Sequence, residues 1–216
     1  MSVNRPGAWK PGTVGQPVAG TTIRIADDDE ILARGPQVFR AYWNDEAATN
    51  EVFHDNGWFH TGDLGELDDD GFLRITGRKK DLIVTASGKN IAGTPLEDRL
   101  NAHPLISQAI VLGDRRPFIA ALIALDEEAA TRWAHSHGRA SASLADLATD
   151  PRLLREIQRA VDAVNRSLSR AESIRKFVVL PRDLRIDTGE LTPTLKVRRN
   201  VVESAYADAI ESLYGP

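Results

Sequence analysis

The chain has 216 residues, of which 42% are hydrophobic and 27% charged, and its formal net charge is −4. These values are those of an ordinary globular protein and exclude a strongly basic chain that attracts nucleic acid. The absence of cysteine excludes a catalytic thiol, a disulfide framework and a thiolate metal site. No apolar run approaches the roughly 18–20 residues of a membrane span, and the first residues lack a signal peptide, so we expect a soluble, cytoplasmic protein.

The first third of the chain, residues 1 to about 77, is predicted to consist of short strands and turns. Residues 22–25 alternate polar and apolar side chains, three aspartates follow, and residues 30–32 resume the strand pattern, which predicts a hairpin. A second hairpin is predicted between residues 64–67 and 72–75. The turn is predicted at the pair Asp70-Gly71, because an Asp-Gly pair supplies the positive φ angles of tight hairpins.

The pattern becomes mixed beyond residue 80. Three further strands are predicted, over residues 82–84, 109–112 and 118–125. A helix is predicted to begin at Thr94, which can act as its N-cap, with Pro95 at the first helical position and Glu97 completing a capping box.

Two more helices complete the predicted elements. One opens at Asp150-Pro151, and its apolar residues recur at helical spacing: Leu153, Ile157, Val161, Val164 and Leu168. The last follows Val197, with one apolar stripe: Val202, Tyr206, Ala209 and Leu213. The predicted fold class is therefore α+β, with a β-rich first third and an α+β remainder that meet near residues 77–81.

The first candidate binding motif is Gly-Trp-Phe-His-Thr-Gly-Asp-Leu at residues 57–64. A carboxylate such as Asp63, just after a glycine, can accept two hydrogen bonds from a vicinal diol such as a ribose. Taken alone, Thr-Gly-Asp is also common turn chemistry.

The second motif covers residues 71–81 and continues to residue 90. Arg78-Lys79-Lys80 form a cationic run that either faces a phosphate or solvates a linker. Further on, Gly88 stands between Ser87 and Lys89, where it permits either close approach of the backbone to a ligand or a simple turn.

The third motif is Gly-Glu-Leu-Thr-Pro-Thr-Leu-Lys at residues 189–196. A proline-containing loop before a helix can present Lys196 outward as a movable point charge. Taken alone, the same lysine is an ordinary surface residue.

These three motifs, in this order and spacing, resemble the adenylate-forming superfamily of acyl-CoA synthetases, luciferases and peptide-synthetase adenylation domains. Residues 12–20, 34–39 and 46–49 agree with the resemblance, which covers nearly the whole chain. The segment 191–196, Leu-Thr-Pro-Thr-Leu-Lys, is similar to the long-chain fatty acyl branch. Gly93 departs from the family pattern, which usually has a proline there, and we expect a local adjustment.

The resemblance implies a role for each motif. Asp63 would hold the ribose hydroxyls of ATP, and Arg78 would lie near the same ribose and phosphate. Lys80 matches the hinge about which a lid rotates. The loop Ser87–Lys89, with Gly88 at its centre, would line the pantetheine tunnel for CoA. Lys196 would be catalytic, entering the active site only in the first half-reaction.

The resemblance also implies the organisation of the chain. Residues 1–77 would be the last β-rich subdomain of a synthetase body, residues 78–81 the hinge, and residues 82–216 a small mobile lid with a central antiparallel sheet flanked by helices. The complete enzyme would convert fatty acid, ATP and CoA to acyl-CoA, AMP and pyrophosphate. The ATP phosphate loop, the adenine segment and the acyl tunnel are not in this sequence, so Mg²⁺ ligands should lie outside it. We expect the isolated chain to be inactive.

Several alternatives stay open. The enzyme can instead be an acyl-AMP ligase that loads a carrier protein, or a CoA synthetase for shorter acyl groups. A non-enzymatic alternative is an interaction module that docks a separate synthetase body. Without that body, the first 77 residues are expected to be partly disordered or covered in a homodimer. No metal site is predicted, because His135 and His137 diverge on a helix, and no nucleic-acid partner is predicted.

Overall fold

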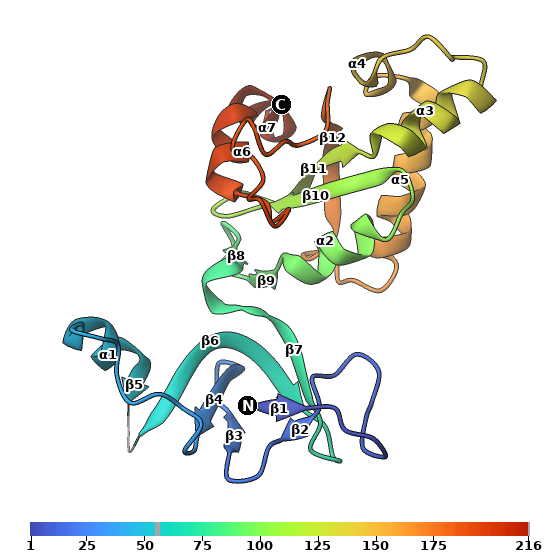
Figure 1. The fold of residues 1–216 in the computed structure, drawn as a ribbon. Helices are drawn as coiled ribbons and strands as arrows, with labels where there is room; N and C mark the ends of the chain where they lie inside the picture. The colour runs from blue at the N-terminus through green and yellow to red at the C-terminus, as the bar shows by residue number, and fades with distance from the viewer. Residues whose placement is uncertain (55–56, 216) are drawn as a thin grey trace. The chain divides into compact units, whose positions relative to one another are not determined.

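The computed structural model describes residues 1–54 and 57–215. The chain divides into two compact units, Met1–Leu82 and Ile83–Pro216. Figure 1 shows the elements of both units in chain order. The predicted α+β class is confirmed, because strands dominate the first unit and the second combines a sheet with helices.

The first unit is built on one five-stranded sheet. Its strands run in the order β3 (Thr22–Ile25), β4 (Glu30–Arg34), β6 (Trp58–Leu67) and β5 (Phe53–His54), and β7 (Leu73–Arg78) also pairs with β6. Smaller elements complete the unit: β1 (Ser2–Val3), β2 (Gln16–Pro17), α1 (Glu46–Val52) and the 3₁₀ helix η1 (Lys79–Asp81). The last strand of this sheet, β7, therefore ends at Arg78, the first residue of the cationic run.

Both predicted hairpins are confirmed. Strands β3 and β4 pair antiparallel around a turn in which Asp29 adopts a φ of +65°. Strands β6 and β7 pair antiparallel around a turn in which Gly71 adopts a φ of +76°. Asp70 is not among the described residues with positive φ, so the glycine alone supplies the left-handed conformation.

The second unit is a three-layer arrangement around a short sheet. Strand β11 (Ile119–Leu125) is buried along its whole length, pairs antiparallel with β10 (Ile106–Leu112) and pairs parallel with β12 (Ile174–Val179). The parallel pair is possible because a long helical crossover separates the two strands: α3 (Glu127–Ser136), α4 (Leu144–Leu147) and α5 (Pro151–Asn165). A separate pair of strands, β8 (Leu82–Val84) and β9 (Asn90–Ala92), precedes α2 (Thr94–Asn101).

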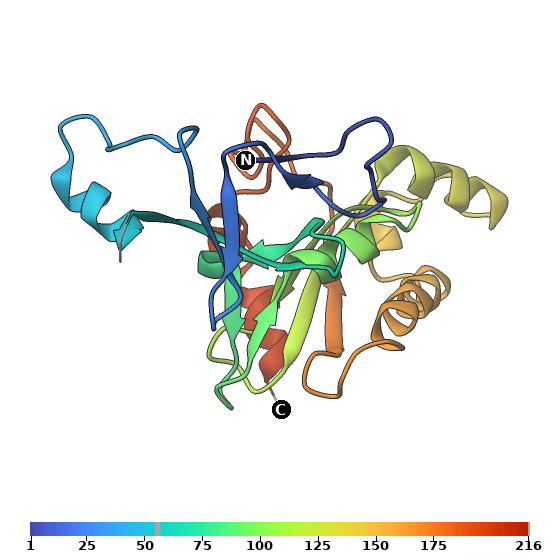
Figure 2. The same ribbon diagram turned by 90° about the horizontal axis from the view of Figure 1, so that it is seen from below.

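Alternate residues of β11 supply the cores of the two faces of this sheet. Ile119 and Ile123 pack with the apolar residues of α2, α3 and α5, whereas Leu122 packs with those of α6 (Arg199–Ala205) and α7 (Ala207–Tyr214). Figures 1 and 2 show the two helix layers on opposite faces of the sheet. The sheet of the second unit is therefore covered by helices on both faces.

The predicted capping box of α2 is wrong. Thr94 is the first residue of the helix and Gly93 precedes it without a side-chain cap. The carboxylate of Glu97 instead accepts a hydrogen bond of 2.7 Å from the backbone N–H of Val111 and pairs with Arg199. A charged partner and a buried amide compete successfully for this carboxylate, because charge-assisted hydrogen bonds are stronger than a local cap.

Two details of the predicted helices also differ. Helix α5 ends at Asn165, so Leu168 lies beyond it, although Leu168 still packs against the core. The predicted final helix is two helices, α6 and α7, broken at Tyr206 with φ −115° and ψ 27°. The break turns the apolar stripe of α7 so that Ile210, and not Ala209, is buried.

Candidate functional site

The structure pairs two residues that the sequence assigned to the nucleotide. Asp63 on β6 and Arg78 at the end of β7 are direct cross-strand partners. The Nε atom of Arg78 lies 2.8 Å from Oδ1 of Asp63, and the Asp63 side chain is 27% exposed. One carboxylate oxygen is thus oriented by the guanidinium, and the group remains open to a ligand that donates hydrogen bonds.

The Thr-Gly-Asp segment is an irregularity in strand β6. The register against β4 shifts at this point, since Leu32 faces His60 while Glu30 faces Leu64. Thr61 donates a hydrogen bond of 2.7 Å to the carbonyl of Ile31, and Gly62 adopts a φ of +70°. Bulges of this kind re-aim side chains, and here the bulge carries Asp63.

A buried glutamate that sequence reasoning missed anchors this bulge. The Glu30 side chain is 4% exposed and its carboxylate accepts hydrogen bonds from Gly62 N (2.9 Å) and Lys79 Nζ (3.0 Å), and it contacts His60 Nδ1 at 2.9 Å. Burial raises the pKa of Glu30, but the hydrogen bonds with His60, Lys79 and Gly62 outweigh it and hold the pKa below its usual value. The only sequence signal was an acidic residue at the start of an otherwise apolar strand.

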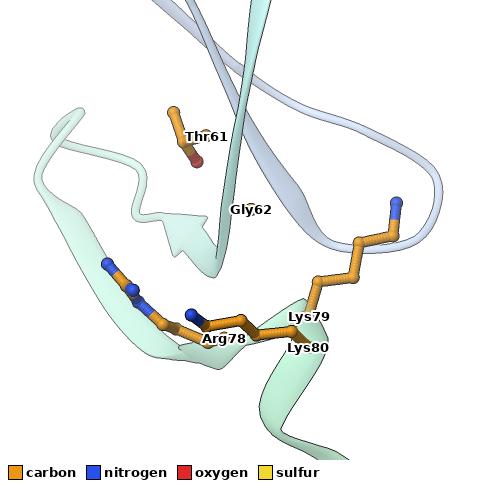
Figure 3. A pocket seen from close by; sticks show the side chains of 5 residues that line it. All are labelled: Thr61, Gly62, Arg78, Lys79 and Lys80. Atoms are coloured by element: carbon orange, nitrogen blue, oxygen red, sulfur yellow. The ribbon is translucent and has the colours of Figure 1, made fainter. Parts of the chain in front are cut away.

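The cationic run borders a surface pocket of about 430 Å³, which is lined by Thr61, Gly62, Arg78, Lys79 and Lys80. Figure 3 shows Arg78 and Lys80 extending to one side of the chain and Lys79 to the other. The Lys79 ammonium lies 2.7 Å from Asp28 and 3.0 Å from Glu30, and these partners raise its pKa. Among the described residues, no carboxylate pairs with Lys80, so its charge is available to an anionic ligand.

The loop around Gly88 in the second unit is a closed turn. The backbone N–H of Thr85 donates to the carbonyl of Lys89 (3.0 Å) and that of Gly88 donates to the carbonyl of Thr85 (2.8 Å). Gly88 adopts a φ of +80°, and, apart from Gly88 and its two chain neighbours, no described atom lies within 4 Å of the position a β-carbon would take. The Lys89 ammonium is held by Ser169 (3.1 Å) and Glu172 (3.2 Å), which ties the loop to the segment after α5.

Lys196 stands on a tight loop between two bridged residues, Leu191 and Val197. The N–H of Thr192 donates to the carbonyl of Lys196 (2.8 Å), and the N–H of Lys196 donates to the Thr192 hydroxyl (3.0 Å). Leu195 adopts a φ of +61°, which turns the chain just before the lysine. Lys196 is exposed, and none of the hydrogen bonds or ion pairs of the described residues involves its ammonium.

The structure thus groups the predicted residues by unit. Asp63, Arg78 and Lys80 lie in the first unit, and the Ser87–Lys89 loop and Lys196 lie in the second. No group of three or more His, Cys, Asp or Glu among the described residues can hold a metal ion. Within residues 1–54 and 57–215, no helix combines the length and the apolar character that crossing a membrane requires.

Known proteins are similar to this chain over nearly its whole length. The chain is 59% identical over 206 residues to the long-chain-fatty-acid–CoA ligase FadD15 of Mycobacterium tuberculosis, covering 95% of this chain and 34% of that protein. It is 36% identical to the long-chain-fatty-acid–CoA ligase ACSBG2 of Xenopus laevis, covering 99% of this chain and 32% of that one. The chain therefore spans about a third of the length of these relatives.

Solved structures share the fold. The O-succinylbenzoate CoA synthetase of Bacillus subtilis, in complex with AMP, is 29% identical with a TM-score of 0.62, covering 88% of this chain and 35% of that one. The adenylation domain of a carboxylate reductase from Mycobacterium chelonae gives a TM-score of 0.71 over 96% of this chain and 33% of that one. At 22% identity, the second likeness supports the fold alone.

The family described as AMP-binding enzyme C-terminal domain matches residues 80–216, which is more than half of the chain. The match includes the Gly88 loop and the Lys196 loop. The chain therefore belongs to the family of AMP-binding enzyme C-terminal domains, which confirms the resemblance to adenylate-forming enzymes that its motifs predicted.

Proposed function

We propose that the chain is the carboxyl-terminal part of a long-chain fatty-acid–CoA ligase, which forms acyl-CoA, AMP and pyrophosphate from a fatty acid, ATP and CoA. The observation that carries the proposal is the 59% identity to FadD15 over 95% of this chain. Since the matched region is 34% of that relative, the remaining N-terminal body would supply the ATP phosphate loop, the Mg²⁺ ligands and the fatty-acid pocket.

In this proposal the chain contains the end of the body, a hinge and a lid. Residues 1–77 are the last β-rich subdomain of the body, residues 78–81 the hinge with Lys80 at its centre, and residues 82–216 the lid. The division of the chain into compact units between Leu82 and Ile83 supports a hinge in this region. A hinge needs only a few residues that absorb a change in backbone angles.

In the first half-reaction, a carboxylate oxygen of the fatty acid attacks the α-phosphorus of ATP and pyrophosphate leaves. Asp63 accepts hydrogen bonds from the ribose hydroxyls, and Arg78 lies beside the ribose and phosphate. Lys196 contacts the acyl carboxylate and the α-phosphate. Negative charge accumulates around phosphorus in the transition state, so a positioned ammonium stabilises that state more than the ground state.

In the second half-reaction, the CoA sulfur attacks the acyl carbonyl, the carbon–oxygen bond to the phosphate breaks, and AMP leaves. The lid turns so that the Lys196 loop moves out and the Ser87–Lys89 loop lines the pantetheine tunnel. Gly88 presents no side chain there, and the contacts of Lys89 with Ser169 and Glu172 support a loop that is already ordered. One rotation thus serves two chemistries.

The proposed partners are the small-molecule substrates and the N-terminal body. The proposed location of the protein is the cytoplasm. Large aromatic side chains on the first unit are exposed, including Trp43 at 91% and Trp9 at 65%, and they offer a surface to that body. Alternatively, a second copy of the chain buries the same surface in a homodimer.

A chimeric ligase tests the proposed function. In it, this chain replaces the equivalent carboxyl-terminal third of FadD15; the isolated chain and the truncated FadD15 body are the controls. With palmitate, ATP, Mg²⁺ and CoA, we expect the chimeric ligase to form palmitoyl-CoA and both controls to form none, because each lacks part of the site.

Two outcomes would contradict the proposal. One is an inactive chimeric ligase under conditions in which intact FadD15 is active. The other is formation of acyl-adenylate that passes to a carrier protein and not to CoA, which favours the carrier-loading alternative.

A further inference from the structure

A second buried carboxylate lies at the base of the Lys196 loop. Glu190 is 1% exposed, and both of its oxygens are bound by the guanidinium of Arg182, at 2.7 and 2.8 Å. The hydroxyl of Thr188 (2.6 Å) and the backbone N–H of Arg185 (3.1 Å) donate to the same carboxylate. Four hydrogen bonds from the segment that precedes the loop thus hold this carboxylate.

The backbone of Glu190 closes the other end of the loop. Its carbonyl accepts a hydrogen bond of 2.8 Å from the N–H of Arg198, and its own N–H donates to the carbonyl of Arg185 at 3.1 Å. The next residue, Leu191, is bridged to Val197 and is buried in the core below α6 and α7. The two ends of the segment that presents Lys196 thus meet at the backbone of Glu190 and at the Leu191–Val197 bridge.

The Glu190 side chain is buried beside a hydrophobic core, which makes a charge there costly. Leu180, Leu184 and Leu191 belong to the same hydrophobic core, and a buried ion pair is weak evidence for stability because desolvation offsets its attraction. An apolar pair would fill this space without that penalty. A hydrogen-bonded carboxylate instead specifies one local geometry, because its directional hydrogen bonds fix the relative positions of Arg182, Thr188 and the loop.

We propose that Glu190 is a positioning residue that holds the Lys196 loop in the geometry required for acyl-adenylate formation. The inference rests on the proposed function and deepens it, because it assigns a role to a residue that touches no substrate. A charge on a flexible loop stabilises a transition state only where the loop is preorganised. Loss of Glu190 should therefore slow the first half-reaction and not the second, in which the Lys196 loop has moved out.

The structure offers a matched control in the same unit. Asp150 is 2% exposed and pairs with Arg139 at 2.9 Å, and it caps helix α5 on the opposite face of the sheet. Asp150→Asn removes one buried charge, as Glu190→Gln does, and Asn is also a good cap. A purely structural role for Glu190 predicts that the two variants behave alike.

The charged groups around Glu190 determine how it responds to pH. They are Arg182, Arg185, Asp187, Asp183 and the phenol of Tyr206. Burial raises the pKa of Glu190, but the hydrogen bonds from Arg182 and Thr188 prevail and lower it from 4.5 to about 2. Since the folded-state pKa is the lower one, the carboxylate stabilises the fold above about pH 4.5, and this contribution is lost as the pH falls toward about 2.

Glu190→Gln is tested first by amide hydrogen exchange on the chain alone, which needs no ligase activity. We expect the amides of Thr192, Lys196 and Arg198 to exchange at least about tenfold faster in this variant, because charged hydrogen bonds at the loop base are lost. Their exchange should not change in Asp150→Asn. The Tm of the wild type should fall more between about pH 5 and pH 3 than that of Glu190→Gln, which has no carboxylate there to protonate.

In the chimeric ligase, Glu190→Gln should slow adenylation between about 10- and 100-fold, as expected for a displaced catalytic group. Transfer from preformed palmitoyl-adenylate to CoA should stay within about twofold, and Asp150→Asn should leave both steps unchanged. If Glu190→Gln does not fold, Arg182→Lys keeps the charge and removes the bidentate contact. Unchanged loop exchange, or equal effects of the Glu190 and Asp150 variants, overturns the inference, whereas an inactive wild-type chimeric ligase counts against the proposed function alone.

Discussion

Replacing Lys196 by alanine is expected to slow acyl-adenylate formation in the chimeric ligase by about 10²- to 10³-fold. The ammonium is exposed on a tight loop with no partner among the described residues, as a charge must be if it is to reach a ligand. Transfer of the acyl group from preformed palmitoyl-adenylate to CoA should stay near the wild-type rate. Pyrophosphate release measures the first step, and palmitoyl-CoA formation from the adenylate measures the second.

Lys176→Ala is the matched control for this prediction. It removes one exposed lysine from the same unit, on strand β12 and outside the sequence of both candidate loops. Both half-reactions should proceed at wild-type rates in the control. If Lys196→Ala also leaves both steps at wild-type rates, the lysine is a bystander and the lid assignment is wrong.

Asp63→Ala should raise the KM for ATP between about 10- and 100-fold, because a carboxylate that accepts hydrogen bonds from a ligand contributes roughly 1.5–3 kcal/mol. The same change leaves Arg78 without the partner that lies 2.8 Å from it, which adds to the loss. The KM values for palmitate and CoA should change little. Steady-state kinetics with each substrate varied in turn provide the measurement.

A nucleotide lacking the ribose hydroxyls isolates the proposed contact. With 2′,3′-dideoxy-ATP, wild type and Asp63→Ala should show similar KM values, because the interaction is already absent. Asp69→Ala, which removes an exposed carboxylate from the neighbouring hairpin turn, should behave as wild type. An equal penalty for Asp63→Ala with ATP and the dideoxy nucleotide would show that Asp63 serves the fold and not the ribose.

Local chemistry made most of the fold predictable. The turn before Glu30 and the turn at Gly71 were identified because turn residues act on their immediate neighbours. Strand β12 (Ile174–Val179) was not predicted, because its partner β11 lies far away in sequence and charged residues interrupt its apolar pattern. The capping box of Glu97 failed for the same reason, since Val111 and Arg199 are distant partners.

The residues of the candidate site also fall into those predicted from local sequence and those that only the structure revealed. Asp63, Arg78 and Lys196 were predicted from motifs, whereas the burial and contacts of Glu30 and Glu190 came only from the structure. Both glutamates act through contacts with other protein groups, and a sequence shows their charge but not their burial. Glu30 contacts the backbone next to Asp63, and Glu190 lies at the base of the loop that carries Lys196. Each buried carboxylate is thus close in the chain or the fold to a residue that a motif had predicted.

The central claim is that two loops of one lid serve two different half-reactions, and comparing Lys196→Ala with Gly88→Asn tests it most directly. Asparagine tolerates the φ of +80° at Gly88, and no described atom beyond the two neighbouring residues lies within 4 Å of its β-carbon position. The fold should therefore persist while the asparagine side chain narrows the proposed path of CoA. In the chimeric ligase, Lys196→Ala should slow adenylation alone and Gly88→Asn should slow transfer to CoA alone. Slowing of the same half-reaction by both variants, or of neither half-reaction by either, would contradict the account.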